Sequence, residues 1–317
     1  MLHRTALAAA ATMVAVLLVG PLRAAHAALP RQDDRGRDRG RDRGGVTGRQ
    51  TIDTTFRMNK GGLVDLEVNS GTIIVTGTTG NEVRVRANAG GGRVRLRASS
   101  TLATLRASGD ARYEVSVPAG VRVVMHTNSG DLTATGVQGD VEAENVSGGI
   151  QLSDISGLAK VETVSGSIVA TRLMGGARIE TTSGDVTLTS GEGEITVDNT
   201  SGTIVLTDIR SSVVRAESLS GGVRFQGDVV ATGRYEFSSH SGNIRLTLPP
   251  SAGALLTLST YSGSINTDFP ITLQQTSSGS DQKELQFRLG TGSARIVAES
   301  FSGNIIITRG TARDRQE

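Results

Sequence analysis

The sequence predicts an all-β fold: a flattened parallel β-solenoid, similar to a β-helix, with about 18–21 residues in each coil. Apolar and polar residues alternate with a period of two from residue 51 onward, as in VDLEVNSGTIIVTG, and no segment of helical period follows the N-terminal leader. A Ser-Gly-x-[Ile/Val/Leu] element occurs ten times. Its serine recurs every 18 residues from Ser129 to Ser201, and then after 19, 21 and 21 residues.

Residues 1–27 have the features of a secretory signal peptide. MLHR is a short basic region, ALAAAATMVAVLLVG is an apolar run, and Ala25-His26-Ala27 is a cleavage pattern of small residues. The alternative is a membrane-anchoring helix, for which a run of about 15 apolar residues is short. We therefore expect an exported mature chain without a transmembrane segment, located in the periplasm, on the cell surface or in the medium.

Residues 28–50 form a low-complexity segment of Arg, Asp and Gly. Almost nothing in it is apolar, so it cannot bury enough surface to become ordered, and we expect a disordered linker. The alternative is an arm that contacts anionic polymers of the cell envelope.

Residues 51–310 are expected to form the solenoid domain, followed by a polar tail at 311–317. Each 18-residue unit holds two strands, and stacking would place Ile150, Ile168, Val186 and Ile204 upon one another. One coil buries too few aliphatic side chains to offset the entropy of its own ordering, so the coils are stable only as a stack.

The ends of this domain are less regular. The last interval between Ser-Gly elements is 40 residues, which predicts two coils of about 20 residues, and residues 271–287 read as a loop or hairpin. Near the other end, NAGGG separates two short alternating segments and predicts a hairpin between them.

The Ser-Gly pair at each corner has a backbone explanation. Glycine can adopt positive φ, and serine can bond to nearby backbone groups, so the pair suits a tight turn. A nucleophilic serine is the alternative, but it would need a basic partner, and ten equivalent serines cannot all be catalytic.

An acidic residue stands three positions before the serine in five consecutive units. We call these residues the acidic column: Glu144, Glu162, Glu180, Asp198 and Glu217. Stacked coils would bring the carboxylates within about 4.8 Å of each other, where like charges repel. Each carboxylate could face solvent and accept hydrogen bonds from corner N–H groups, or the column could bind Ca²⁺. Both alternatives stay open at this point.

Five arginines lie on two neighbouring segments. We call them the arginine set: Arg84, Arg86, Arg93, Arg95 and Arg97. Their spacing of two residues places each group on one strand face. They could form a basic stripe for acidic polysaccharide or other envelope components, or simply keep the sheet soluble.

The composition is poor in catalytic groups. The chain has no cysteine and no tryptophan. Its only histidines beyond residue 27, His126 and His240, stand at repeat positions, so we expect no metal ligand set and no cofactor. After loss of Arg4 and Arg23 the chain would carry 31 basic and 31 acidic residues, which argues against nucleic-acid binding.

The units NSGDL, VSGSI and TSGDV, with the lead-in YEVSVPAGVRVVMHTNSGDL, resemble a bacterial family of exported domains of unknown function that carries an adhesin label. That family is related to the head domains of autotransporter-like adhesins. The lead-in returns as IRLTLPPSAGALLTLSTYSGSI, and the resemblance covers roughly residues 51–309. It implies a β-solenoid at the cell envelope and carries no catalytic residues.

Three functions follow from these patterns. We expect a non-enzymatic exported scaffold or adhesion surface, with cell-surface glycans or envelope components as its partners. The alternative is a polysaccharide lyase or hydrolase, which would need paired carboxylates at one cleft. A third possibility is self-association through the solenoid ends, because the last strand, in FSGNIIITRG, would expose unpaired backbone.

Overall fold

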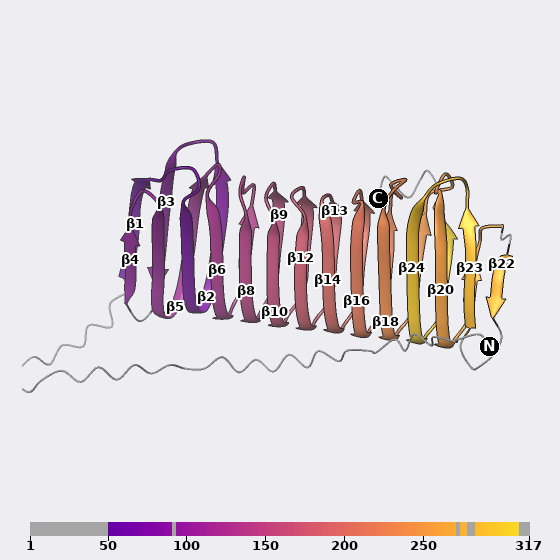
Figure 1. The fold of residues 1–317 in the computed structure, drawn as a ribbon. Helices are drawn as coiled ribbons and strands as arrows, with labels where there is room; N and C mark the ends of the chain where they lie inside the picture. The colour runs from indigo at the N-terminus through magenta and orange to yellow at the C-terminus, as the bar shows by residue number, and fades with distance from the viewer. Residues whose placement is uncertain (1–49, 91–92, 271–272, 278–282, 311–317) are drawn as a thin grey trace, which may run out of the picture. The chain divides into compact units, whose positions relative to one another are not determined.

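The computed structural model describes residues 50–90, 93–270, 273–277 and 283–310, which form a stack of β-coils with two opposed faces (Figure 1). The predicted signal peptide, residues 28–49 of the predicted linker and the predicted tail lie outside the described residues. No described residue is helical, so this part of the chain contains no helix that could cross a membrane. The predicted all-β solenoid is confirmed.

The first face holds one strand from every coil. Its spatial order is β4 (Val94–Ala98), β5 (Leu102–Pro118), β2 (Leu63–Thr78), β6 (Arg122–Ser129), β8 (Val141–Ser147), β10 (Ala159–Ser165), β12 (Ala177–Ser183), β14 (Glu194–Ser201), β16 (Val213–Ser220), β18 (Arg234–Ser241), β24 (Ala294–Ser302), β20 (Ala254–Ser262), β23 (Lys283–Leu289) and β22 (Leu273–Ser277).

The second face holds the other strand of each coil. Its order is β1 (Gln50–Arg57), β3 (Glu82–Ala89), the second halves of β5 and β2, β7 (Leu132–Thr135), β9 (Ile150–Ile155), β11 (Ile168–Leu173), β13 (Val186–Gly191), β15 (Ile204–Ile209), β17 (Val223–Gly227), β19 (Ile244–Leu248), β25 (Ile305–Arg309) and β21 (Ile265–Thr267).

The core lies between the two faces and consists of stacked aliphatic side chains. Ile168 is in register with Ile150 on one side and with Val186 on the other, and Val186 with Ile204. All four side chains are buried. The predicted stacking is confirmed, and it explains why the sequence repeats: each coil completes the core of its neighbours.

The Ser-Gly corner, where the chain passes from the first face to the second, is built from close backbone contacts. Gly184 has φ +139°, and its N–H donates to the carbonyl oxygen of Ser201 in the next coil at 3.0 Å. A Cβ added at Gly184 would lie 2.0 Å from the carbonyl oxygen of Gly166 in the preceding coil. Glycine is therefore required by positive φ and by the close approach of two coils.

A column of small polar side chains is buried at the same corner, two positions before each serine. Its members are Thr127, Asn145, Thr163, Thr181, Asn199, Ser218, Ser239, Thr260 and Ser300. Asn199 Nδ2 donates to the carbonyl oxygen of Gly184 at 3.1 Å, and the Ser201 N–H donates to Asn199 Oδ1 at 2.9 Å. Six of the nine side chains bond to backbone groups of the corner in this way, whereas the hydroxyl groups of Thr163, Thr181 and Ser218 have no hydrogen-bond partner among the described residues.

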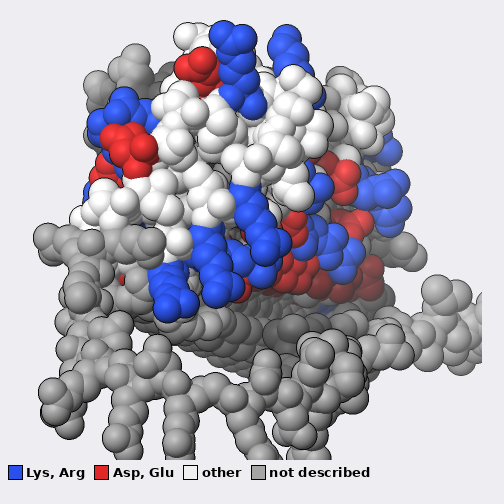
Figure 2. Space-filling model, turned by 90° about the vertical axis from the view of Figure 1, so that its left-hand side faces the viewer, with Lys and Arg blue, Asp and Glu red and all other residues white. Residues whose placement is uncertain are grey.

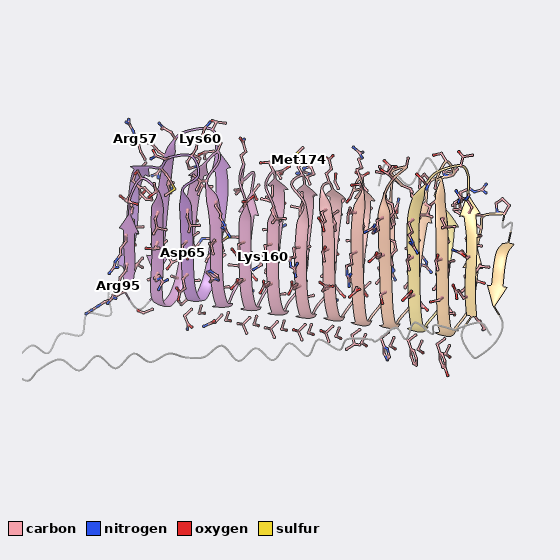
Figure 3. All side chains as sticks on the ribbon, viewed as in Figure 1. Arg57, Lys60, Asp65, Arg95, Lys160 and Met174 are labelled. Carbon is pink, nitrogen blue, oxygen red and sulfur yellow. The ribbon has the colours of Figure 1, made fainter. Side chains whose placement is uncertain are left out.

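The opposite corner, where Met174 lies (Figure 3), contains left-handed residues that are not glycine. Asp154, Arg172, Ser190 and Asp208 stand 18 residues apart and have φ between 52° and 60°. Arg172 Nη2 donates to Asp154 Oδ2 at 2.7 Å, which links two neighbouring coils. This column was not predicted from the sequence, although aspartate tolerates this conformation better than most residues.

The C-terminal coils are not stacked in chain order. Strand β24 lies between β18 and β20, so the last coil of the chain enters the stack before the coil that precedes it in sequence. The prediction that the 40-residue interval forms two coils is therefore wrong. This interval contains the antiparallel strands β22 and β23, followed by β24. The pairing of β22 with β23 confirms the predicted hairpin at 271–287.

The last strand of the chain is not at the end of the stack. Strand β25 pairs with β19 on one side and with β21 on the other, so its backbone groups are used. The prediction that this strand offers unpaired backbone for self-association is wrong, because the out-of-order insertion covers it.

The N-terminal end is also closed by antiparallel strands. Strand β3 pairs with the second half of β5, and β4 pairs with the first half of β5. The predicted hairpin across NAGGG is therefore wrong: the two segments do not pair with each other, but each lies on a different face of the stack. Each segment pairs with β5 instead, because β5 is long enough to contribute an edge to both faces of the stack.

Candidate functional site

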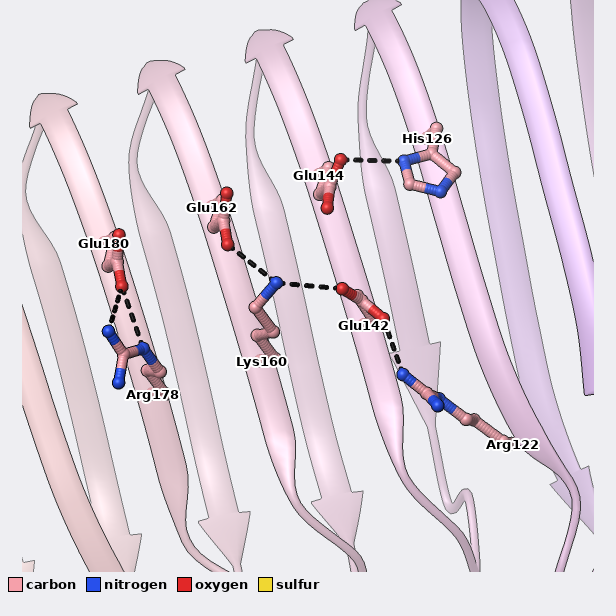
Figure 4. Close-up of polar contacts among 8 residues, drawn as sticks. All are labelled: Arg122, His126, Glu142, Glu144, Lys160, Glu162, Arg178 and Glu180. Carbon is pink, nitrogen blue, oxygen red and sulfur yellow. Dashed lines mark hydrogen bonds and ion pairs between the residues drawn. The ribbon is translucent and has the colours of Figure 1, made fainter. Parts of the chain in front are cut away.

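The acidic column lies on the outer surface of the first face (Figure 4). Cα registers pair Glu144 with Glu162, Glu162 with Glu180, Glu180 with Asp198, and Asp198 with Glu217. Figure 4 shows the first three members of the column, Glu144, Glu162 and Glu180. The predicted column of carboxylates in consecutive coils therefore exists. Whether it binds a ligand depends on what offsets the repulsion between its members.

Basic side chains beside the column supply that compensation. Lys160 Nζ lies 2.8 Å from Glu162 Oε1, Arg178 Nη2 lies 2.8 Å from Glu180 Oε1, and Arg215 Nη2 lies 2.7 Å from Glu217 Oε1. Each cation stands two residues before its carboxylate on the same strand. Glu144 is paired differently, with His126 Nδ1 at 3.0 Å in the neighbouring coil. These pairings replace the predicted hydrogen bonds to corner N–H groups.

Lys160 also joins two coils. Its Nζ donates to Glu142 Oε1 at 2.9 Å, and Glu142 Oε2 accepts from Arg122 Nη2 at 2.8 Å. The hydrogen bond from Lys160, followed by that from Arg122, lowers the pKa of Glu142 below its ordinary value, and Glu162 and Glu142 raise the pKa of Lys160. The surface next to the column is thus an alternating network of charges and not a purely acidic stripe.

Asp198 is the exception in the column. Thr196 stands where its neighbours have a basic residue, and Asp198 has no ion pair among the described residues. Burial, followed by the negative charge of Glu217, raises the pKa of Asp198. No three acidic or histidine side chains in the described ranges are placed to share a metal ion, so the geometry does not favour the Ca²⁺ alternative.

The arginine set is divided between two faces. Arg84 and Arg86 lie on β3 and share one carboxylate, Asp53, whose oxygen Oδ2 is 3.1 Å from Arg84 Nη2 and 3.2 Å from Arg86 Nε. Both hydrogen bonds lower the pKa of Asp53, that from Arg84 the more strongly. Arg95 and Arg97 lie on β4, on the other face, so the five side chains do not form one stripe.

The second part of the set has no acidic partner. Arg93, Arg95 and Arg97 are exposed, and no ion pair to them occurs within the described part of the chain. Strand β4 is an edge strand, because β5 is its only pairing partner among the described strands. Charged side chains on such an edge discourage pairing with another sheet, and they also present unneutralised positive charge.

A hollow of about 400 Å³ lies beside the first part of the set. Arg84 and Arg86 line it together with Arg112 and Glu114, which pair with each other at 3.0 Å. The three guanidinium groups outnumber the two carboxylates that neutralise them, Asp53 and Glu114. Both faces of the N-terminal end therefore carry an excess of positive charge.

This excess sets the N-terminal end apart from the middle of the stack. Residues 50–118 contain nine Lys and Arg against six Asp and Glu, whereas residues 119–248 contain nine against fifteen. Figure 2 looks onto the N-terminal end and shows a row of Lys and Arg side chains there. The solenoid is thus electrically polar along its stack, with a basic end next to an acidic body.

The first face also carries an exposed aromatic stack, which was not predicted from the sequence. The ring of Phe301 lies between those of His240 and Tyr261, with centroid distances of 4.8 and 5.0 Å and interplanar angles of 4° and 1°. Each ring belongs to the residue before a corner serine. The common position was visible in the sequence, but Phe301 could be placed between the other two only once the coil order was known.

Three solved structures are similar to this chain. A candidate cell adhesion protein from Clostridium sporogenes is 10% identical, with 83% of this chain and 100% of that chain covered and a TM-score of 0.21. A candidate adhesin from Bacteroides fragilis is 11% identical over 82% of this chain and 98% of that chain, with a TM-score of 0.39. A candidate adhesin from Parabacteroides distasonis is 10% identical over 82% and 97%, with a TM-score of 0.34.

No curated protein matches the chain. The family model described as Toastrack DUF4097 matches it twice, over residues 46–198 and 177–308, and together these matches span residues 46–308. The chain therefore belongs to the Toastrack DUF4097 family.

Proposed function

We propose that the protein is a non-enzymatic, exported scaffold that binds acidic polymers of the cell envelope through its basic N-terminal end. The observation that carries this proposal is the row of Arg93, Arg95 and Arg97, exposed and without an acidic partner in the described part of the chain. A charged surface without internal compensation attracts polymers of opposite charge. The predicted signal peptide would export the chain to the cell envelope, where this end would meet such polymers.

The acidic central coils, residues 119–248, limit where an acidic polymer can bind. Six more carboxylates than basic groups lie in residues 119–248, as fifteen against nine, and they would repel the same polymer. A polyanion is therefore expected to contact the N-terminal end and to avoid the central coils. The rest of the stack then acts as a spacer built from successive coils, each of which contacts only its neighbours.

The enzymatic alternative has less support. A glycosidase needs two carboxylates across one cleft. Of two hollows on the described surface, one is lined by the single carboxylate Glu114 and the other by none. In the acidic column the carboxylates lie one per coil, and all but Asp198 are engaged by a basic or histidine side chain.

The test compares two charge-matched double variants of the full chain. Arg95→Gln/Arg97→Gln removes two unpaired arginines from the basic end. Arg224→Gln/Arg245→Gln removes two exposed arginines from neighbouring strands of the second face, also without an ion pair among the described residues. Binding to immobilised polygalacturonate, with neutral dextran as the control polymer, is measured at several salt concentrations.

The proposal expects polygalacturonate binding that weakens with salt and falls about tenfold in the first variant, since two charges at the contact are lost. The second variant should bind like wild type. Absence of binding by wild type, or an equal loss in both variants, would overturn the proposal, because the N-terminal end would then have no special role.

A further inference from the structure

A second hollow lies at the C-terminal end, at the corner opposite the Ser-Gly corner. We call it the C-terminal hollow. It has a volume of about 510 Å³ and is lined by Val229 and Ala231, residues 250–253, Phe269 and Pro270, residues 288–292, and Arg309. Its size is in the range of sites for small molecules.

The C-terminal hollow exists because the chain leaves its regular order. In the central coils this corner is a short turn. The insertion of β24 between β18 and β20 brings turns together that are far apart in sequence. Two of them touch: a Cβ added at Gly292 would lie 2.0 Å from the carbonyl oxygen of Gly253. The backbone contact of these glycines fixes one wall of the hollow.

The charge of the C-terminal hollow is positive. Arg288 and Arg309 are the only ionisable side chains in its lining, and neither forms an ion pair within the described residues. The guanidinium carbon of Arg309 lies 5.1 Å from the centroid of the Phe269 ring, and this ring is buried. The cation–π contact holds Arg309 at the edge of the hollow while leaving its N–H donors available.

The remaining lining suits a sugar ring. Pro250 and Pro270 are exposed and present apolar surface, and Ser251 and Thr291 add hydroxyl groups. A hexose has apolar C–H faces and hydroxyl groups at its rim, and a uronic acid adds a carboxylate that matches the planar donors of arginine. Such a ligand requires apolar walls, a few polar groups and cationic side chains, and the C-terminal hollow has all three.

We propose that the C-terminal hollow binds an acidic sugar unit, a uronate, with Arg288 and Arg309 as the carboxylate-binding residues. This site is at the other end of the stack from the arginines of the proposed function and does not depend on them. It recognises one or two sugar units, whereas the N-terminal end attracts a polymer through its charge.

The test is calorimetric titration of the full chain with digalacturonate, a neutral galactose disaccharide and inorganic phosphate as separate probes. The variant Arg288→Gln/Arg309→Gln removes both cations, and Arg224→Gln/Arg245→Gln is the matched control. Unfolding midpoints of all variants are compared first, so that loss of binding is not loss of fold.

We expect digalacturonate to bind wild type and the control equally, with at least about tenfold weaker binding to Arg288→Gln/Arg309→Gln, because charge-assisted hydrogen bonds are lost. Arg95→Gln/Arg97→Gln should keep this binding to digalacturonate even though its binding to polygalacturonate is weaker, so failure of either proposal can be recognised separately. No binding of digalacturonate, equal binding of the neutral disaccharide or of phosphate, or an unchanged affinity in Arg288→Gln/Arg309→Gln would overturn the proposal.

Discussion

Replacing Gly184 by alanine tests the explanation of the Ser-Gly corner most sharply. The new Cβ would lie 2.0 Å from the carbonyl oxygen of Gly166 and 2.7 Å from its carbonyl carbon. These are backbone atoms of a packed coil, so they cannot rotate away as a side chain could. The φ of +139° is also a conformation that alanine rarely adopts.

Two costs add in this variant. The unfavourable φ costs about 1–3 kcal/mol, and separation of the two coils disturbs at least one hydrogen bond at the corner, which costs about 1–3 kcal/mol when a buried group loses its partner. The nearest such bond runs from the Gly166 N–H to the Ser183 carbonyl at 3.0 Å. We therefore expect a loss of about 2–6 kcal/mol in the free energy of unfolding, measured by urea denaturation with circular dichroism.

Gly149→Ala is the matched control. Gly149 follows the corner glycine Gly148, and a Cβ there would meet nothing closer than 3.4 Å, the distance to Asp131 Oδ1. Its substitution should change the free energy of unfolding by less than about 0.5 kcal/mol. If Gly184→Ala were as stable as Gly149→Ala, close approach of the coils would not be the reason for the repeated glycine.

Three further predictions concern the side chains on the outer surface. Phe301→Ala removes both stacked contacts, with His240 and Tyr261, and should lower the free energy of unfolding by about 1–3 kcal/mol; an unchanged urea midpoint would show that the stack contributes nothing. Asp198→Asn should raise the melting temperature at pH 7. Burial raises the pKa of Asp198 above its ordinary 3.8, so the folded state holds the proton more tightly than the unfolded state does. The wild-type protein therefore loses stability as the pH rises from 3.8 through the raised pKa of Asp198. The gain should vanish below about pH 4, and a variant no more stable than wild type at pH 7 would contradict this assignment. Finally, millimolar Ca²⁺ should leave the melting temperature equal to that in chelator, because four carboxylates of the acidic column are already paired with basic or histidine side chains. A rise of several degrees that Glu162→Gln/Glu180→Gln abolishes would restore the column as a cation site.

The regular coils could be predicted from the sequence because their signal is local and repeated. An 18-residue period with alternating aliphatics determines the register of Ile150, Ile168 and Val186, and the Ser-Gly pair indicates the corner. The acidic column followed from the same period. Its basic partners, such as Lys160 and Arg178, were visible two residues earlier in the sequence, but their pairing was found only in the structure.

The order of the end coils could not be predicted for a physical reason. FSGNI and YSGSI carry equivalent corner motifs, so either could stack on HSGNI with a similar core. The detour through β22 and β23 decides which one does. The C-terminal hollow and the aromatic stack both depend on this order, and for that reason neither could be found from a repeat pattern alone.

The most direct test of the central claim is a hydrogen–deuterium exchange footprint of the full chain with polygalacturonate at low salt. A polymer held by the basic end should slow backbone exchange in β4 and β1 and leave the central strands β12 and β14 unchanged, because edge strands have backbone amides without a partner strand and the central coils are acidic. Protection that is spread over the central strands, or is absent at β4 and β1 while the polymer is bound, would contradict the assignment of the N-terminal end as the binding surface.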